Sequence, residues 1–179
     1  MTPPPADRAD GSARAKPDGR IIRDVVLAAA LDAGARQIVF GVGGSASTDG
    51  GTGLLQALGA QVLDTRGDPL TRGGGALRDV AVLDLAGLHP GLRECPVILA
   101  TDVANPLTGP DGAAGIFGPQ KGATPDQVAE LDASLRRWAK VVAEATGTDL
   151  RTRSSVSTAP RNDAQASTAA SKRSMAISL

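Results

Sequence analysis

The chain has 179 residues, enough for one domain with one sizeable core, and its 19 basic residues balance its 19 acidic ones. A net charge of zero gives no long-range attraction to nucleic acid or to an acidic membrane surface, and an aromatic content of 2% argues against base-stacking platforms for single strands. The single cysteine, Cys95, excludes an intrachain disulfide and a cysteine-based zinc cluster. No apolar run is long enough to span a bilayer, and the N-terminus lacks the hydrophobic region of a secretory signal, so we expect a cytoplasmic protein.

Both ends of the chain are expected to be disordered. Residues 1–20 are rich in Pro, Ala, Asp and Arg without apolar periodicity, and residues 151–179 are dominated by Ser, Thr, Ala and Arg. Neither segment can bury enough apolar surface to offset the entropy of ordering. The folded part is therefore expected to be a single α/β domain over residues 21–150.

The first elements alternate between helix and strand. A helix is predicted to end at Gly34, a good residue for the position after a helix. One side of this helix carries its apolar residues, namely Ile21, Ile22, Val25, Val26 and Ala29. The run RQIVFGV at 36–42 predicts a buried strand, residues 43–51 a loop, and residues 52–58 a short helix.

Shorter elements follow along the chain. Residues 61–63 and 80–83 are possible strands, with a turn at 65–68 and a flexible loop at 71–75 between them. Residues 97–101 predict a second buried strand. A long loop with several prolines and glycines is then expected over 102–123.

The last helix has the strongest local signals. Thr124 can cap it, Pro125 suits its first turn, Gln127 completes a capping box, and Gly147 ends it. A single apolar stripe at three-four spacing makes Trp138 a core anchor, and its members are Val128, Leu131, Leu135, Trp138 and Val142. Strands alternating with helices predict an α/β fold, a mostly parallel sheet with flanking helices.

The glycine-rich segment GVGGSASTDGG, residues 41–51, follows a predicted strand and precedes a helix. Glycines let backbone N–H groups approach an anion, and a helix N-terminus adds the positive end of its dipole. Ser45, Ser47 and Thr48 add hydroxyl donors. The alternative is a tight strand-to-helix turn that simply requires small residues.

A dinucleotide-binding module of an oxidoreductase is the rival interpretation of this loop. Residues 41–46 fit G-x-G-x-x-A, and Asp64 stands near the distance expected for a ribose-binding acid. Asp49 weakens this interpretation, because a carboxylate entering the helix would repel a bare pyrophosphate. An acid there suits phosphates accompanied by Mg²⁺, or a substrate hydroxyl.

Two further segments carry candidate site residues. Asp102 follows the strand at 97–101, and ligands of open α/β sheets collect beyond the carboxyl ends of strands. Asp49 and Asp102 could therefore face one crevice and hold Mg²⁺ or deprotonate an alcohol. A turn leading into Asn105 is the structural alternative for Asp102. Lys121, in a loop or lid over 109–125, could neutralise phosphate or carboxylate charge, or could be a solvated lysine.

Together these segments resemble the bacterial-type glycerate kinase family over residues 22–148. The resemblance rests on LDAGARQIVFGVGGSASTDGGTGLLQALGAQVLD followed by TDVANPLTGPDGAAGIFGPQKGATP, in order and at similar spacing. It implies a flavodoxin-like α/β part with a second domain, and Mg²⁺-dependent transfer of the γ-phosphoryl group of ATP to D-glycerate, a small-molecule substrate.

The resemblance also implies roles for particular residues. Asp49 and Asp102 would be the active-site acids and Mg²⁺ ligands. The pocket would be lined by the loop residues Gly43, Gly44, Ser45 and Ser47, and by Asn105 and Lys121.

The ends depart from the family. Its members are roughly twice this length and carry an APDSFKGS-like start and a later GEGRLD-like segment, which do not occur here. We hypothesise a truncated or frameshifted gene product. Much of the pocket would then be missing, which argues against activity of the chain alone, and uncovered apolar sheet edges would favour self-association.

Overall fold

The computed structural model describes residues 19–41, 47–100 and 103–150. Four α-helices, four strands and three short 3₁₀ helices (η) appear in these ranges. In chain order they are α1 (Gly19–Asp32), β1 (Ile38–Gly41), α2 (Thr52–Ala57), β2 (Gln61–Asp64), η1 (Gly74–Asp79), β3 (Val80–Asp84), η2 (Pro90–Arg93), β4 (Val97–Ala100), α3 (Ala113–Phe117), η3 (Pro119–Lys121) and α4 (Pro125–Thr146). Every strand and helix predicted from the sequence is present. The disorder expected at the two ends falls outside the described residues, apart from positions 19 and 20, which belong to α1.

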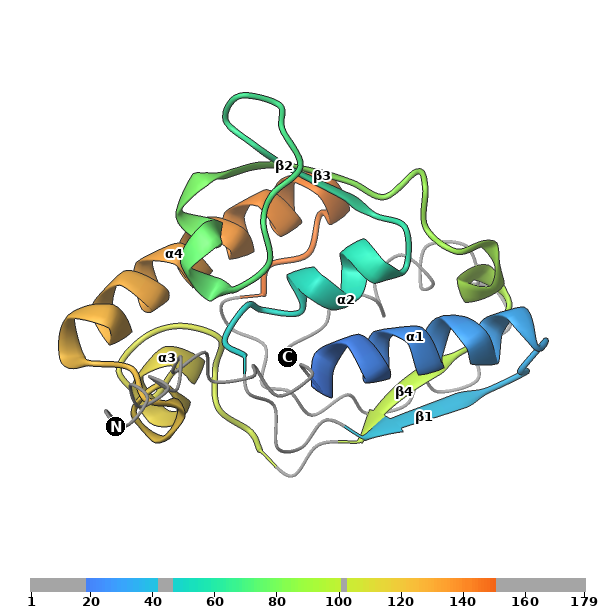
Figure 1. The fold of residues 1–179 in the computed structure, drawn as a ribbon, viewed down its shortest axis with the longest axis horizontal. Coiled ribbons are helices and arrows are strands. Elements are labelled where there is room, and N and C mark those ends of the chain that lie inside the picture. Colours follow the sequence, from blue (N-terminus) through green and yellow to red (C-terminus); the bar gives the residue numbers. More distant parts are fainter. Residues whose placement is uncertain (1–18, 42–46, 101–102, 151–179) are drawn as a thin grey trace, which may run out of the picture.

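The strands form two separate pairs (Figure 1). β1 and β4 are parallel, with Ile38 opposite Val97 and Gly41 opposite Ala100. Figure 1 shows α1 lying along this pair, so the α/β class with a parallel sheet and flanking helices is confirmed. β2 and β3 form an antiparallel hairpin, a pairing that the sequence patterns did not indicate, and the hairpin packs beside α4.

The parallel strands are less buried than predicted. Each residue of β1 and β4 is partly or fully exposed, and Val39 reaches 67% exposure. Ile38 and Phe40 pack against the core, whereas Val39 points to the opposite face because side chains alternate along a strand. The prediction of buried strands at 36–42 and 97–101 is therefore wrong for the described residues, whose elements cover only one face of this pair.

The buried face of α1 also differs from the prediction. Val26 is 58% exposed and Ala29 is exposed, whereas Leu27 and Leu31 are buried. The last two lie one turn apart and pack against α2 and Cys95, so tertiary contacts select a different stripe of this apolar helix. The side chains of positions 21, 22 and 25 lie outside what the structure describes.

The larger core is organised by α4. Trp138 and Leu135 are fully buried, as the stripe predicted, and they pack with Leu77 and Val80. The capping box of α4 is present in both directions, and Gly147 ends the helix with φ of 70°. Within the segment expected to be a long loop, α3 and η3 are additional helices. No helix in the described ranges combines the length and apolarity needed to cross a membrane.

Candidate functional site

Asp49 lies at the entry to α2 with its carboxylate turned inward. The residue is only 5% exposed. Its Oδ1 accepts hydrogen bonds from the Gly51 N–H at 3.2 Å and from the Ser47 hydroxyl at 3.3 Å. The Thr52 hydroxyl donates to the Asp49 carbonyl at 2.6 Å. In this conformation Asp49 therefore fixes the loop that enters α2, and little of its surface is open to a ligand.

The other side of the same loop is held by α4. The indole Nε1 of Trp138 donates to the Gly50 carbonyl at 2.9 Å. A Cβ atom at position 50 would lie 2.6 Å from Cδ1 of Trp138, so only glycine allows this approach. Sequence reasoning assigned Trp138 to the core and missed this second role, which the need of a buried indole N–H for an acceptor could have indicated.

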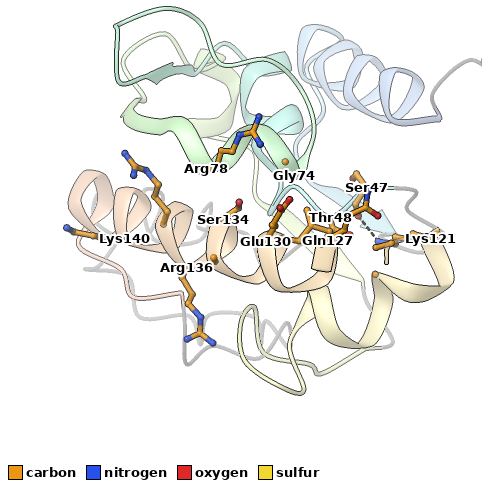
Figure 2. Close-up of a pocket in the computed structure, with 17 residues that line it drawn as sticks. Ser47, Thr48, Gly74, Arg78, Lys121, Gln127, Glu130, Ser134, Arg136 and Lys140 are labelled. Carbon is orange, nitrogen blue, oxygen red and sulfur yellow. Dashed lines mark hydrogen bonds between the residues drawn. The ribbon is translucent and has the colours of Figure 1, made fainter. Parts of the chain in front are cut away.

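Lys121 joins the site from η3. Its Nζ donates to the Ser47 carbonyl at 2.6 Å (Figure 2). The same Nζ lies 5.9 Å from the centre of the Phe117 ring. The lysine is exposed, but it is tethered to the loop and is more than a solvated side chain. The structure thus brings together Ser47, Asp49 and Lys121, three of the residues predicted to form the site.

The structure does not place the other predicted site residues in contact with Ser47, Asp49 and Lys121. The Asn105 amide donates to the Asp111 carbonyl at 3.1 Å and closes its own loop, with no hydrogen bond to Asp49 or Lys121. Gly43, Gly44, Ser45 and Asp102 lie outside the described residues. The expected meeting of the two aspartates in one crevice therefore stays a prediction.

An open groove runs from this group along α4, and no sequence pattern pointed to it. It has a volume of about 990 Å³ and lies between η1 and α4. Ser47, Thr48 and Lys121 line one end, and Lys140 lines α4 further along (Figure 2). Arg137, on the same helix, is also part of the lining. Gly74, Gly75 and Arg78 line the opposite wall, which belongs to η1. The groove thus connects the loop of Asp49 with a basic stretch of α4.

Asp64 is the acid that the dinucleotide interpretation assigned to ribose. Its carboxylate is instead bound by the residues of the turn that follows it. Its carboxylate accepts from the backbone N–H groups of Arg66 at 2.8 Å and Asp68 at 3.0 Å, and it pairs with the Arg66 guanidinium at 2.9 Å. Desolvation works to raise the pKa of Asp64, but these hydrogen bonds and the charge of Arg66 outweigh it and lower the pKa. Because β2 pairs antiparallel with β3 and not with β1, the strand arrangement of a dinucleotide fold is missing from the described residues, and the oxidoreductase interpretation has no support.

Comparison with known proteins gives a consistent result. The sequence model of the Glycerate kinase family matches residues 21–170. A glycerate kinase of Bacillus subtilis (strain 168) is 48% identical over 126 residues, which are 70% of this chain and 33% of that protein. A glycerate 2-kinase of Escherichia coli (strain K12) is 46% identical over 122 residues, covering 68% of this chain and 32% of its own length.

The fold agrees with these sequence matches. A crystal structure of a protein assigned as glycerate kinase 2 from Salmonella typhimurium LT2 superposes with a TM-score of 0.71 and 44% identity. The superposition covers 73% of this chain and 35% of that one. The chain spans about a third of the length of the relatives it matches. Since the family model covers most of its residues, the chain belongs to the glycerate kinase family.

Proposed function

We propose that this chain carries part of the active site of a glycerate kinase, which transfers the γ-phosphoryl group of ATP to D-glycerate. The observation that carries the proposal is the family match over residues 21–170, supported by relatives named glycerate kinase at 46–48% identity. A cytoplasmic location belongs to the same proposal, because ATP is the donor.

The geometry around Ser47 suits this chemistry. Phosphoryl transfer is catalysed mainly by positioning and by neutralisation of charge on the phosphates. Lys121 places a positive charge against the carbonyl of Ser47, the last residue of the glycine-rich segment 43–47. Gly43, Gly44, Ser45, Ser47 and Asn105 are proposed to line this pocket. The loop would then receive the phosphates, and Lys121 would offset their charge.

Asp49 and Asp102 are proposed as the acids of the site. Mg²⁺ is usually held by one or two carboxylates together with substrate phosphates and water, and Asp49 and Asp102 would supply such carboxylates. Mg²⁺, when bound, would neutralise the phosphates, and either acid could instead accept the proton of the glycerate hydroxyl.

A chimera tests the proposal without requiring the chain to act alone. The 126 matched residues would replace their counterparts in the Bacillus subtilis relative, and ADP release would be measured with D-glycerate. We expect an active chimera, and a loss of about 100-fold or more in turnover for Asp49→Asn. Asparagine keeps the oxygen that accepts from Gly51, so the loop should remain folded.

The matched control is Asp84→Asn, an exposed acid of β3 whose carboxylate accepts from the Ala86 N–H. This variant should keep full turnover. A folded chimera without kinase activity would contradict the proposed function. An active chimera in which Asp49→Asn has no effect would leave Asp49 as a purely structural residue.

A further inference from the structure

The groove between η1 and α4 is strongly basic, although the whole chain has no net charge. Its volume of about 990 Å³ is at the upper end of the usual range for small-molecule sites. Besides Arg136, which Asp132 neutralises, four lining residues are cationic and only Glu130 is acidic, which leaves the lining three positive charges in excess. The four are Arg78, Lys121, Arg137 and Lys140.

Arg137 is the cation best placed to bind a ligand. Its Nε donates to the Val80 carbonyl at 2.6 Å, which holds the guanidinium against β3. No acidic side chain in the described ranges lies within ion-pair distance of it. Arg136 differs, because it pairs with Asp132 at 2.8 Å and points away from the groove in Figure 2.

The ion pairs of Arg78 and Lys140 are weak. Arg78 pairs with Asp79 at 3.5 Å and Lys140 with Glu144 at 3.9 Å, and all four side chains are more than half exposed. Exposed pairs of this kind contribute little free energy because water screens them. Both cations could therefore exchange these partners for an anionic ligand.

A hydroxyl on the same helix can also meet a ligand. Ser134 is 4% exposed and lines the groove. Figure 2 shows it on the side of α4 that faces Gly74 and Arg78. Its hydroxyl could donate a hydrogen bond to an oxygen atom of a phosphate.

The opposite wall is shaped to let a ligand approach the backbone. Gly74 lies so close to the loop that a Cβ there would collide with the Thr48 carbonyl oxygen, and Gly75 has nothing within 4 Å of its Cβ position. The wall therefore contacts the loop of Asp49 at Gly74, and it leaves space for a ligand at Gly75.

We infer that this groove binds the phosphate chain of a nucleoside triphosphate, with the terminal phosphate towards Ser47 and Lys121. From Gln127 to Lys140 the helix extends roughly 20 Å, so the groove is longer than a triphosphate chain and also has room for the nucleoside attached to it. Naming the ligand as a nucleotide rests on the proposed function, whereas the site for a chain of phosphates does not.

Titration of the purified full chain with tripolyphosphate, without divalent metal, tests the inference. Calorimetry gives the affinity, and Trp138 is the only tryptophan in a chain without tyrosine, so its emission reports directly on the loop. ATP and inorganic phosphate serve as comparison ligands. We expect tripolyphosphate and ATP to bind alike and inorganic phosphate to bind much more weakly.

Three variants locate the site. Arg137→Gln removes the charge but keeps a donor for the Val80 carbonyl, and it should weaken tripolyphosphate binding about 10- to 100-fold. Glu130→Gln removes the one acid of the lining and should strengthen binding several-fold. Arg93→Gln, an exposed cation of η2 outside the groove, should leave the affinity unchanged.

Absence of tripolyphosphate binding to the folded chain would overturn the inference, and so would an equal effect of Arg137→Gln and Arg93→Gln. Binding that depends on Arg137 would support it even if the chimera had no kinase activity. Conversely, an active chimera whose KM for ATP is unchanged by Arg137→Gln would overturn the inference and leave the proposed function standing.

Discussion

The contact between Gly50 and Trp138 makes a quantitative prediction. Gly50 has φ of 57°, which costs any other residue about 1–2 kcal/mol. In Gly50→Ala the new methyl group would also lie 2.6 Å from Cδ1 and 2.9 Å from Nε1 of Trp138, and 3.3 Å from Cδ2 of Leu135. Overpacking of this kind costs about 1–3 kcal/mol. The free energy of unfolding should therefore fall by about 2–5 kcal/mol, a large part of the 5–15 kcal/mol typical of a domain.

Gly147→Ala is the matched control. Gly147 has a similar φ of 70°, but nothing lies within 4 Å of its Cβ position, so this variant should lose only the backbone contribution of about 1–2 kcal/mol. Urea denaturation followed by far-UV circular dichroism measures both variants. The difference between them isolates the collision with α4.

Equal losses of unfolding free energy in the two alanine variants would refute this reasoning. The neighbours of Gly50 would then move aside at no cost, and α4 would not constrain the loop that contains Asp49. A change of Trp138 emission in Gly50→Ala, and not in Gly147→Ala, is the local sign of the strain that we expect.

Three further predictions concern other parts of the structure. Thr124→Ala removes the hydroxyl that accepts from the Gln127 N–H, and it should lower stability by about 1 kcal/mol in thermal melts. Hydrogen bonds and the charge of Arg66 lower the pKa of Asp64 in the folded protein. The ionised carboxylate therefore stabilises the fold when the pH is above the ordinary pKa of 3.8, and this stabilisation is lost as the pH falls through the lowered pKa of the folded state. Asp64→Asn should therefore be less stable than the unchanged chain near neutral pH, with a difference in Tm that disappears in acid. Val39→Lys should reduce self-association in sedimentation velocity without lowering Tm, because Val39 is 67% exposed.

The elements that the sequence predicted well are those defined by local chemistry. The ends of α4 follow from Thr124, Gln127 and Gly147, each of which acts on backbone groups within one turn. The apolar stripe of α4 was equally clear, because polar residues occupy its other faces. In α1 apolar residues surround much of the helix, so contacts with α2 decide that Leu27 is buried and Val26 is not.

Features that depend on distant residues could not be predicted in the same way. The burial of β1 depends on which elements cover each of its faces, and the sequence pattern of the strand contains no information about those elements. The groove needs Arg78 from η1 and Arg137 from α4, which no local spacing connects. The approach of Lys121 to Ser47 was suggested only by resemblance to a family, and the structure places these two in direct contact.

The packing anchors the loop of Asp49 to the larger of two apolar clusters. The smaller apolar cluster holds α1, β1 and β4, whereas the larger one is built on α4, η1 and the β2–β3 hairpin. α2 belongs to both, since Leu55 packs into the larger cluster and Leu54 into the smaller. The Gly50 carbonyl is bound by Trp138, a residue of the larger cluster, so the loop is anchored from the α4 side. Further strands could therefore extend the β1–β4 sheet in a protein of family length without displacing either this loop or the walls of the groove.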